Sequence, residues 1–303
     1  MEYAHSEYLA ETDWLEQQLD NPRLRIFDVT GMLTASLQNL ARERGYDLGH
    51  IPGAQFLDVA NAKGALSNPD AALPWTWPTT AQFERTLQEA GVDNDSTTIV
   101  YSSTPRKGVD FGPMWSTRAW WVLHHFGVEC RVLNGGWEKW LAEGRPVSSE
   151  TVSRPGTHFR AKSGGENGIA SKADVLAAIG PEGPRCVVDA LSEASFAGTD
   201  RVRYGPRRGH ISGAVNMPMY RLLDPATGVF LPAEEIRACF ERAGVTWTQP
   251  VITYCGGAIA ATVDAFALVL CGHEHVSVYD GSLAEWSADL TLPMIDPSAS
   301  SPA

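Results

Sequence analysis

One cysteine of the chain stands in a setting that favours nucleophilic chemistry. Cys255 directly follows the apolar run Val251–Tyr254, and Gly256, Gly257 and Ala258 come next. The apolar run predicts a buried strand, and the apolar stretch after the glycines predicts a helix from Ala258 onward. Glycines let backbone N–H groups turn inward around an anion, and the positive end of a helix dipole adds to their effect. Both effects favour a thiolate, so the sequence predicts a lowered Cys255 pKa and a catalytic nucleophile.

The cysteine belongs to the second of two similar halves. The first half contains Gly-His-Ile-Pro-Gly-Ala at residues 49–54, and the second contains Gly-His-Ile-Ser-Gly-Ala at residues 209–214. A repeat of this length indicates two complete domains of one fold. Where the second half has Cys255, the first has Ser102. This difference indicates that one half carries the chemistry and that the other half is structural.

Short apolar strands alternate with helical segments in both halves. Strands are predicted at 25–29, 97–101, 129–133, 186–189, 251–254 and 276–279, and helices at 6–19, 79–90, 114–126, 171–179, 233–243 and 258–270. This alternation predicts an α/β protein in which each domain is a mostly parallel sheet with helices on both faces. Ligands of such sheets bind outside the carboxyl ends of the strands, which is where Cys255 stands.

Composition sets the expected domain boundaries. We expect a non-catalytic domain at 1–145, a linker at 146–168, a catalytic domain at 169–292 and a flexible tail at 293–303. The linker region is rich in Ser, Gly, Pro and Arg, and Phe159 is the apolar side chain expected to anchor it.

Charge and hydropathy exclude several classes of function. The 303 residues carry a formal charge of −12, which argues against nucleic acid as a partner because phosphate binding needs a basic face. No apolar run approaches the roughly 20 residues that span a bilayer, and the first residues resemble no secretory signal. The five cysteines show no paired spacing, so we expect free thiols in a reducing cytoplasm.

The histidines of the chain are expected to be structural. His50 and His210 lie in the repeated motif, where they are expected to hold the turn before the next strand. His273 and His275 are two positions apart, as ligands on one strand face would be, but no third ligand is evident. The sequence therefore predicts neither a metal site nor a bound cofactor.

The motifs taken together resemble the tandem rhodanese family, the thiosulfate and 3-mercaptopyruvate sulfurtransferases. The resemblance covers nearly the whole chain and rests on Trp14-Leu15, Asp28-Val29-Thr30, Gly49–Ala54, Arg118–Trp121, Val132–Trp137, Gly209–Pro218 and Tyr254–Gly257. It implies an inactive first domain and a Cys255 thiolate that takes sulfur from a small anionic donor. The resulting persulfide would pass its sulfur to cyanide, a thiol or another nucleophile. The N–H groups of Gly256, Gly257, Ala258, Ile259 and Ala260 would hold the terminal sulfur.

The resemblance leaves the donor open. The loop after Cys255 is neutral, as in 3-mercaptopyruvate enzymes, but two substrate-binding arginines of those enzymes correspond to Leu191 and Ser195 here. A basic cluster precedes His210, and its Arg203, Arg207 and Arg208 are candidates to bind an anionic donor, with Arg106-Lys107 as a weaker candidate. The alternative is a solvated basic loop. We expect activity with both donors.

Two other functions remain to be weighed against sulfur transfer. A cysteine-based phosphatase needs an arginine that closes the loop on the phosphoryl oxygens, but Ala261 stands six positions after Cys255. A non-catalytic binding or regulatory protein is the second alternative, because rhodanese-like domains often take such roles. An intact cysteine in a glycine-rich loop argues against it.

Overall fold

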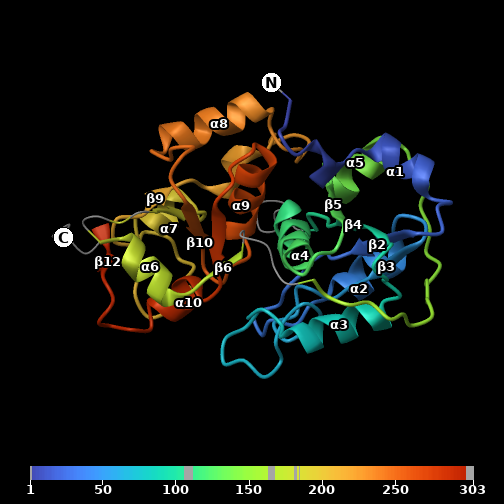
Figure 1. Cartoon of the computed structure of the whole chain (residues 1–303), viewed down its shortest axis with the longest axis horizontal. Coiled ribbons are helices and arrows are strands. Elements are labelled where there is room, and N and C mark those ends of the chain that lie inside the picture. The colour runs from blue at the N-terminus through green and yellow to red at the C-terminus, as the bar shows by residue number, and fades with distance from the viewer. Residues whose placement is uncertain (1, 106–111, 163–167, 181–182, 184, 298–303) are drawn as a thin grey trace. The chain divides into compact units, whose positions relative to one another are not determined.

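The structure, a computed structural model, describes residues 2–105, 112–162, 168–180, 183 and 185–297. The internal contacts of the chain divide it into two compact units (Figure 1). The first unit comprises Ser6–Gly165 together with Asp224–Phe230. The second comprises Met1–His5, Glu166–Leu223 and Leu231–Ala303.

The first unit is built on a five-stranded parallel sheet in the order β1-β5-β4-β2-β3. Its strands are β1 (Leu9–Ala10), β2 (Leu24–Asp28), β3 (Ala54–Phe56), β4 (Thr97–Tyr101) and β5 (Cys130–Leu133). Its helices are η1 (Ser6–Tyr8), α1 (Thr12–Gln18), α2 (Ala41–Arg44), η2 (Tyr46–Leu48), α3 (Thr80–Glu89), α4 (Pro113–His125) and α5 (Gly136–Ala142). The segment predicted as one helix over 6–19 is split, because Leu9–Ala10 pairs with β5.

The second unit repeats this sheet in the order β6-β11-β10-β7-β9. Its strands are β6 (Gly168–Ala170), β7 (Cys186–Asp189), β8 (His210–Ile211), β9 (Val215–Asn216), β10 (Val251–Tyr254), β11 (Val276–Tyr279) and β12 (Met294–Ile295). Its helices are α6 (Lys172–Ala178), α7 (Glu193–Phe196), η3 (Met219–Leu222), α8 (Ala233–Arg242), α9 (Ala261–Leu270) and α10 (Ser282–Trp286). Figure 1 shows the helices of each unit gathered around its sheet, and the predicted two-domain α/β fold is confirmed.

Local sequence explains where several helices begin. Thr79 caps α3 through a capping box with Gln82, and Ser171 caps α6 in the same way with Asp174. Helix α9 is mostly apolar, and every one of its residues is buried, including Thr262 and Asp264. Such a helix belongs in the interior of a domain, so the segment after Cys255 is held on all sides.

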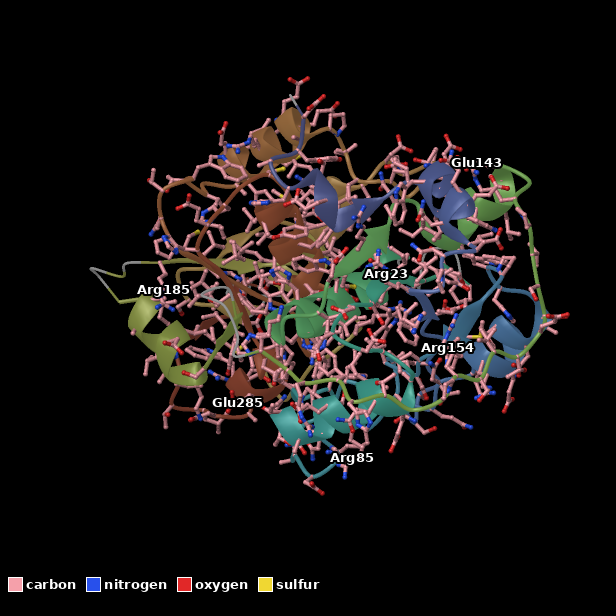
Figure 2. The ribbon with its side chains drawn as sticks, turned by 45° about the vertical axis from the view of Figure 1, so that its right-hand side comes forward. Arg23, Arg85, Glu143, Arg154, Arg185 and Glu285 are labelled. Carbon is pink, nitrogen blue, oxygen red and sulfur yellow. The ribbon has the colours of Figure 1, made fainter. Side chains whose placement is uncertain are left out.

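The connecting chain after residue 145 packs along the first unit as far as it is described. Thr157 N–H donates to the carbonyl of Gln88 at 3.1 Å, and Arg154, labelled in Figure 2, runs beside Gly91. Phe159 is only 1 % exposed and meets Phe83 edge to face, so it anchors this segment. Residues 163–167 of the predicted linker lie outside the described residues.

The end of the chain begins with a paired strand where the sequence predicts a flexible tail from residue 293. Met294–Ile295 forms β12 and pairs antiparallel with β8, Ile295 opposite His210. Backbone hydrogen bonding to a strand that carries the repeated motif orders this segment. Residues 298–303 of the predicted tail lie outside the described residues.

Candidate active site

The sheet places Cys255 at the carboxyl end of its central strand. Cys255 directly follows β10, whose last residue Tyr254 pairs with Asp189 of β7. Helix α9 begins at Ala261, so the prediction of a helix from Ala258 is wrong by three residues. The chain from Cys255 to Ala260 instead forms a curved loop, hereafter the cysteine loop, in which Ala258 has a left-handed φ of +59°. Left-handed backbone at a residue with a β-carbon is strained, and such strain clusters at functional sites.

Backbone donors surround the sulfur of Cys255. The backbone N–H groups of Ala261, Gly257 and Ile259 face it and lower the pKa of its thiol. The structure thus brings two members of the predicted donor set, Gly257 and Ile259, to the sulfur and adds Ala261. Three convergent N–H groups form an anion-binding nest of the kind the sequence predicts.

The pKa of Cys255 departs from the prediction. Its side chain is buried, with the residue only 2 % exposed, and desolvation raises the pKa of the thiol above its ordinary value. The three N–H donors lower it, and the nearby charge of Asp189 raises it further. The prediction of a lowered pKa is therefore wrong, because removal of the sulfur from water outweighs the dipoles that face it.

Ser282 holds the cysteine loop from beneath and was missed by sequence reasoning. Its hydroxyl accepts the N–H groups of Cys255 at 3.2 Å and Ala258 at 3.0 Å, and it donates to the carbonyl of Tyr279 at 2.8 Å. Ser282 is fully buried and has a left-handed φ of +47°. The repeat held a signal for it, because the first half has Gly135-Gly136 where the second has Gly281-Ser282.

Two buried carboxyl groups lie behind the loop. Asp189 accepts the N–H of Leu191 at 2.9 Å, and burial raises its pKa to about 7. Asp264, in the first turn of α9, is fully buried and neither of its oxygens has a hydrogen-bond partner. Burial, followed by the charge of Asp189, raises the pKa of Asp264 well above its ordinary value. Burial of Asp264 therefore favours its protonated, neutral form.

Two of the predicted anion-binding arginines serve the fold instead. Arg207 donates to the carbonyls of Ser287, Leu292, Trp286 and Asp289 at 2.7–3.0 Å, which ties the end of α10 to the following turn. Arg208 donates to the carbonyls of Gly198 and Asp200 at 3.0 Å. Charge in the sequence showed that these residues are basic but not that backbone carbonyls occupy their donors. Because these contacts use their donors, both residues are weaker candidates than Arg203 to bind an anionic donor.

Arg203 is the remaining candidate of that group. It is exposed, and its guanidinium has no side-chain partner among the described residues. Arg203 lines a pocket of about 300 Å³ of open space, part of it solvent, in the second unit. The same pocket is lined by Ser195, Gly198, Asp200, Val202, Tyr204, Arg207, Arg208, Gly209 and Leu283. Arg106 and Lys107, the weaker candidates, lie outside the described residues.

The positions that lack the family's arginines have local roles. Leu191 is buried, and Ser195 donates its hydroxyl to Asp200 at 2.7 Å. The backbone N–H of Val202, the hydroxyl of Ser195 and further donors lower the pKa of Asp200, so its carboxylate is charged at neutral pH. The pocket therefore presents one negative group beside Arg203.

The histidines of the repeat bind the backbone. His50 Nδ1 lies 2.8 Å from the carbonyl of Tyr46 and stacks on that ring, and His210 Nδ1 lies 2.8 Å from the carbonyl of Phe196 and stacks likewise. These contacts agree with the structural role expected for both. Within the described ranges, no three His, Cys, Asp or Glu side chains gather as metal ligands would, and no helix is long and apolar enough to cross a membrane.

The two α/β units and the cysteine loop at the end of a parallel strand can be compared with known proteins. The rhodanese-like domain model matches residues 11–143 and 171–289. The sulfur carrier protein TtuD of Thermus thermophilus is 32% identical and covers 97% of this chain and 98% of its own. The rat thiosulfate sulfurtransferase is 32% identical, over 92% of this chain and 91% of its own. The solved structure of the 3-mercaptopyruvate enzyme SseA from Escherichia coli has a TM-score of 0.76 at 32% identity, covering 91% of this chain and 98% of its own.

The chain therefore belongs to the rhodanese-like domain family, with two copies of the domain. Within that family it is a sulfurtransferase of the rhodanese type.

Proposed function

We propose that this protein moves a sulfane sulfur from thiosulfate or 3-mercaptopyruvate to cyanide or a thiol acceptor through a persulfide on Cys255. The observation that carries the proposal is the cysteine loop, in which three N–H groups converge on the sulfur. These donors are fixed by the fold, so they stabilise negative charge on sulfur without reorganisation during the reaction. The mercaptopyruvate and thiosulfate enzymes among the relatives supply the two donor classes.

The burial of Cys255 suits a persulfide. A thiol with a raised pKa is mostly protonated at neutral pH, so the reactive thiolate is a minor form that becomes more abundant as the pH rises. The persulfide's terminal sulfur is the better anion, and the N–H groups of Gly257, Ile259 and Ala261 are the donors available to it. The first unit is non-catalytic in this proposal, because Ser102 cannot form a persulfide.

Arg203 is the group we assign to donor attraction. Its guanidinium has no partner among the described residues, and it borders the same pocket as Tyr204. A single exposed charge attracts a carboxylate or a sulfonate without a dedicated fork, which fits use of both donors at modest affinity. Exposed charges are screened at physiological ionic strength, so donor affinity should weaken with salt.

Mass spectrometry tests the proposal directly. The protein is incubated with each donor in turn, desalted, and its intact mass and the peptide containing Cys255 are measured. A gain of one sulfur atom on Cys255, removed again by cyanide, is the expected result. A protein that remains unmodified by both donors would instead support the binding or regulatory alternative.

A further inference from the structure

Tyr204 lies directly over the start of the cysteine loop. A β-carbon built on Gly256 would overlap the ring of Tyr204, so only glycine permits this approach. The ring also lines the pocket that holds Arg203, Asp200 and Leu283. The Tyr204 ring therefore contacts both that pocket and the loop that carries Cys255.

The hydroxyl of Tyr204 is available for chemistry. This hydroxyl has no hydrogen-bond partner among the described residues, although the residue is only 38% exposed. Desolvation by burial, followed by the charges of Cys255, Asp200 and Asp189, raises the pKa of Tyr204 above its ordinary value. The phenol thus keeps its proton at neutral pH.

We propose that Tyr204 is a catalytic acid that protonates the carbon left behind when a carbon-bound donor such as 3-mercaptopyruvate gives up its sulfur. The proposal rests on the Cys255 persulfide function described above and adds a catalytic residue to it. Three observations carry it: the ring on Gly256, the unpaired hydroxyl, and the shared pocket with Arg203.

The bonds and protons of this step balance. The Cys255 thiolate attacks the thiol sulfur of 3-mercaptopyruvate, and the new S–S bond forms as the C–S bond breaks. The electron pair of that bond goes to the carbon, as the enolate of pyruvate, which the phenol of Tyr204 protonates. The proton that the donor thiol carried is now on the terminal sulfur of the persulfide, and it returns to the oxygen of Tyr204. The products are pyruvate and an anionic persulfide.

Sulfur transfer from thiosulfate needs no proton donor. When Cys255 attacks its outer sulfur, the bond between the two sulfur atoms of thiosulfate breaks and the electron pair leaves with sulfite. Sulfite is a stable anion that needs no proton in this step. Removal of the Tyr204 hydroxyl should therefore distinguish the two donors, whereas loss of the ring or of the loop geometry should harm both.

The test compares Tyr204→Phe with wild type and with Tyr220→Phe. Tyr220 is a similarly exposed tyrosine of the same unit, whose hydroxyl contacts Glu193 on the surface. Steady-state kinetics are measured with each donor and a common thiol acceptor, together with the solvent deuterium isotope effect on kcat. Thermal melting confirms that the variants are folded.

Tyr204→Phe should lower kcat with 3-mercaptopyruvate by about 100-fold, the usual range for loss of a general acid, and change kcat with thiosulfate by less than about threefold. Tyr220→Phe should change neither. Equal losses with both donors, no loss with either, or a wild type that does not use 3-mercaptopyruvate would overturn the assignment. Failure of the underlying function is distinguished by the mass measurement, because then neither donor adds sulfur to Cys255 of the wild type.

Discussion

A loop follows the central strand of each unit, β4 in the first and β10 in the second. The two loops occupy the same place in the fold, but their backbone N–H groups have different partners. In the first unit the hydroxyl of Ser102 donates to the carbonyl of Gly112, and the N–H groups of Ser103 and Thr104 go to side chains elsewhere. In the second, the N–H groups turn inward to the Cys255 sulfur. Among the described residues of the first loop, the N–H groups of Ser103 and Thr104 are occupied by side chains, so they are not available to stabilise an anion at residue 102.

The residue that packs against each loop also differs between the two units. Gly136 stands beneath Ser102, and a β-carbon there would overlap the carbonyl of Ser102. Ser282 stands in the corresponding place of the second unit and binds two N–H groups of the cysteine loop. The cysteine loop is thus tied to β11 through a side chain, whereas the first unit has glycine at that place.

Replacement of the nucleophile is the strongest test of this difference. Cys255→Ser should abolish sulfur transfer, by more than about 1000-fold, because an oxygen of similar size cannot form a persulfide here. Steady-state rates and melting temperature are measured together. Measurable turnover in the folded serine variant would exclude Cys255 as the site.

Ser102→Cys is its matched control in the first unit. The introduced thiol should gain no sulfur, because the N–H of Ser103 already donates to Thr30 at 3.0 Å and that of Thr104 to Glu138 at 2.6 Å. A persulfide detected on the peptide that carries this cysteine would contradict the comparison.

Ser282→Gly makes the support of the second loop like that of the first. The N–H groups of Cys255 and Ala258 lose their acceptor, so the loop should lose its fixed shape and kcat should fall by about 10- to 100-fold. Glycine tolerates the left-handed φ of +47°, so backbone strain does not confuse the result. Kinetics and the yield of persulfide report the effect, and an unchanged kcat would show that Ser282 only fills space.

Asp264 marks a further difference, because Ala119 stands at the same distance before the glycine that ends the first unit's helix. Asp264→Val should raise the free energy of unfolding by about 1–3 kcal/mol at neutral pH, since an unpartnered buried carboxyl is replaced by apolar volume. Denaturant unfolding at pH 7 measures the change. A destabilised variant with normal cooperativity would mean that the carboxyl contributes to the stability of the fold.

The raised pKa values also set how activity and stability change with pH. The thiolate of Cys255 is the attacking form, and its pKa is raised. The rate of persulfide formation should therefore keep increasing with pH beyond the ordinary pKa of a thiol. Asp189→Asn removes a negative neighbour and should shift this rise in rate to lower pH.

The raised pKa of Asp189 makes the fold less stable as the pH rises. Its pKa is about 7 in the folded state and near 4 in the unfolded state, so its contribution to stability is complete below about 4 and is lost as pH rises through 7. Rate profiles and unfolding at several pH values measure both, and an unshifted profile in the asparagine variant would exclude the coupling.

The smallest effect is expected at the pocket. Arg203→Ala should raise KM for both donors about three- to tenfold and leave kcat nearly unchanged, the pattern of lost uniform binding. High salt should reduce the difference between wild type and variant, because screening already weakens an exposed charge. Kinetics at low and high ionic strength provide the measurement. A variant with wild-type KM at low salt would move donor recognition to other residues.

The sequence predicted the features that depend on local pattern. Strands 97–101, 186–189, 251–254 and 276–279 are observed at the predicted residues, because short apolar runs between turn residues leave little choice. Cys255 was found for the same reason, since a strand, a cysteine and two glycines are contiguous in the chain. The repeat of the Gly-His-Ile motif separated the two halves, because each copy of the fold carries it once.

What the sequence did not predict depends on contacts between distant residues. Ser282 reaches Cys255 from 27 positions away, and Tyr204 reaches Gly256 from the loop that precedes β8. The partners of Arg207 are backbone carbonyls, which carry no signal in a sequence. The Cys255 pKa was predicted with the wrong sign because the N–H donors could be inferred from glycines, whereas the depth of burial could not.

The assignment of short segments to the opposite unit has a consequence for synthesis on the ribosome. Residues 224–230 complete the first unit, where the N–H of Phe230 donates to Asn134 at 3.1 Å, and the first five residues belong to the second, where the N–H of His5 donates to Leu270 at 3.1 Å. The leading domain of a nascent chain commonly folds first. Here the first unit is incomplete until residues 224–230 have been translated. Likewise, residues 1–5 cannot make their contact with the second unit until Leu270 has left the ribosome. A gene cut between the halves would therefore separate each product from a segment that it needs.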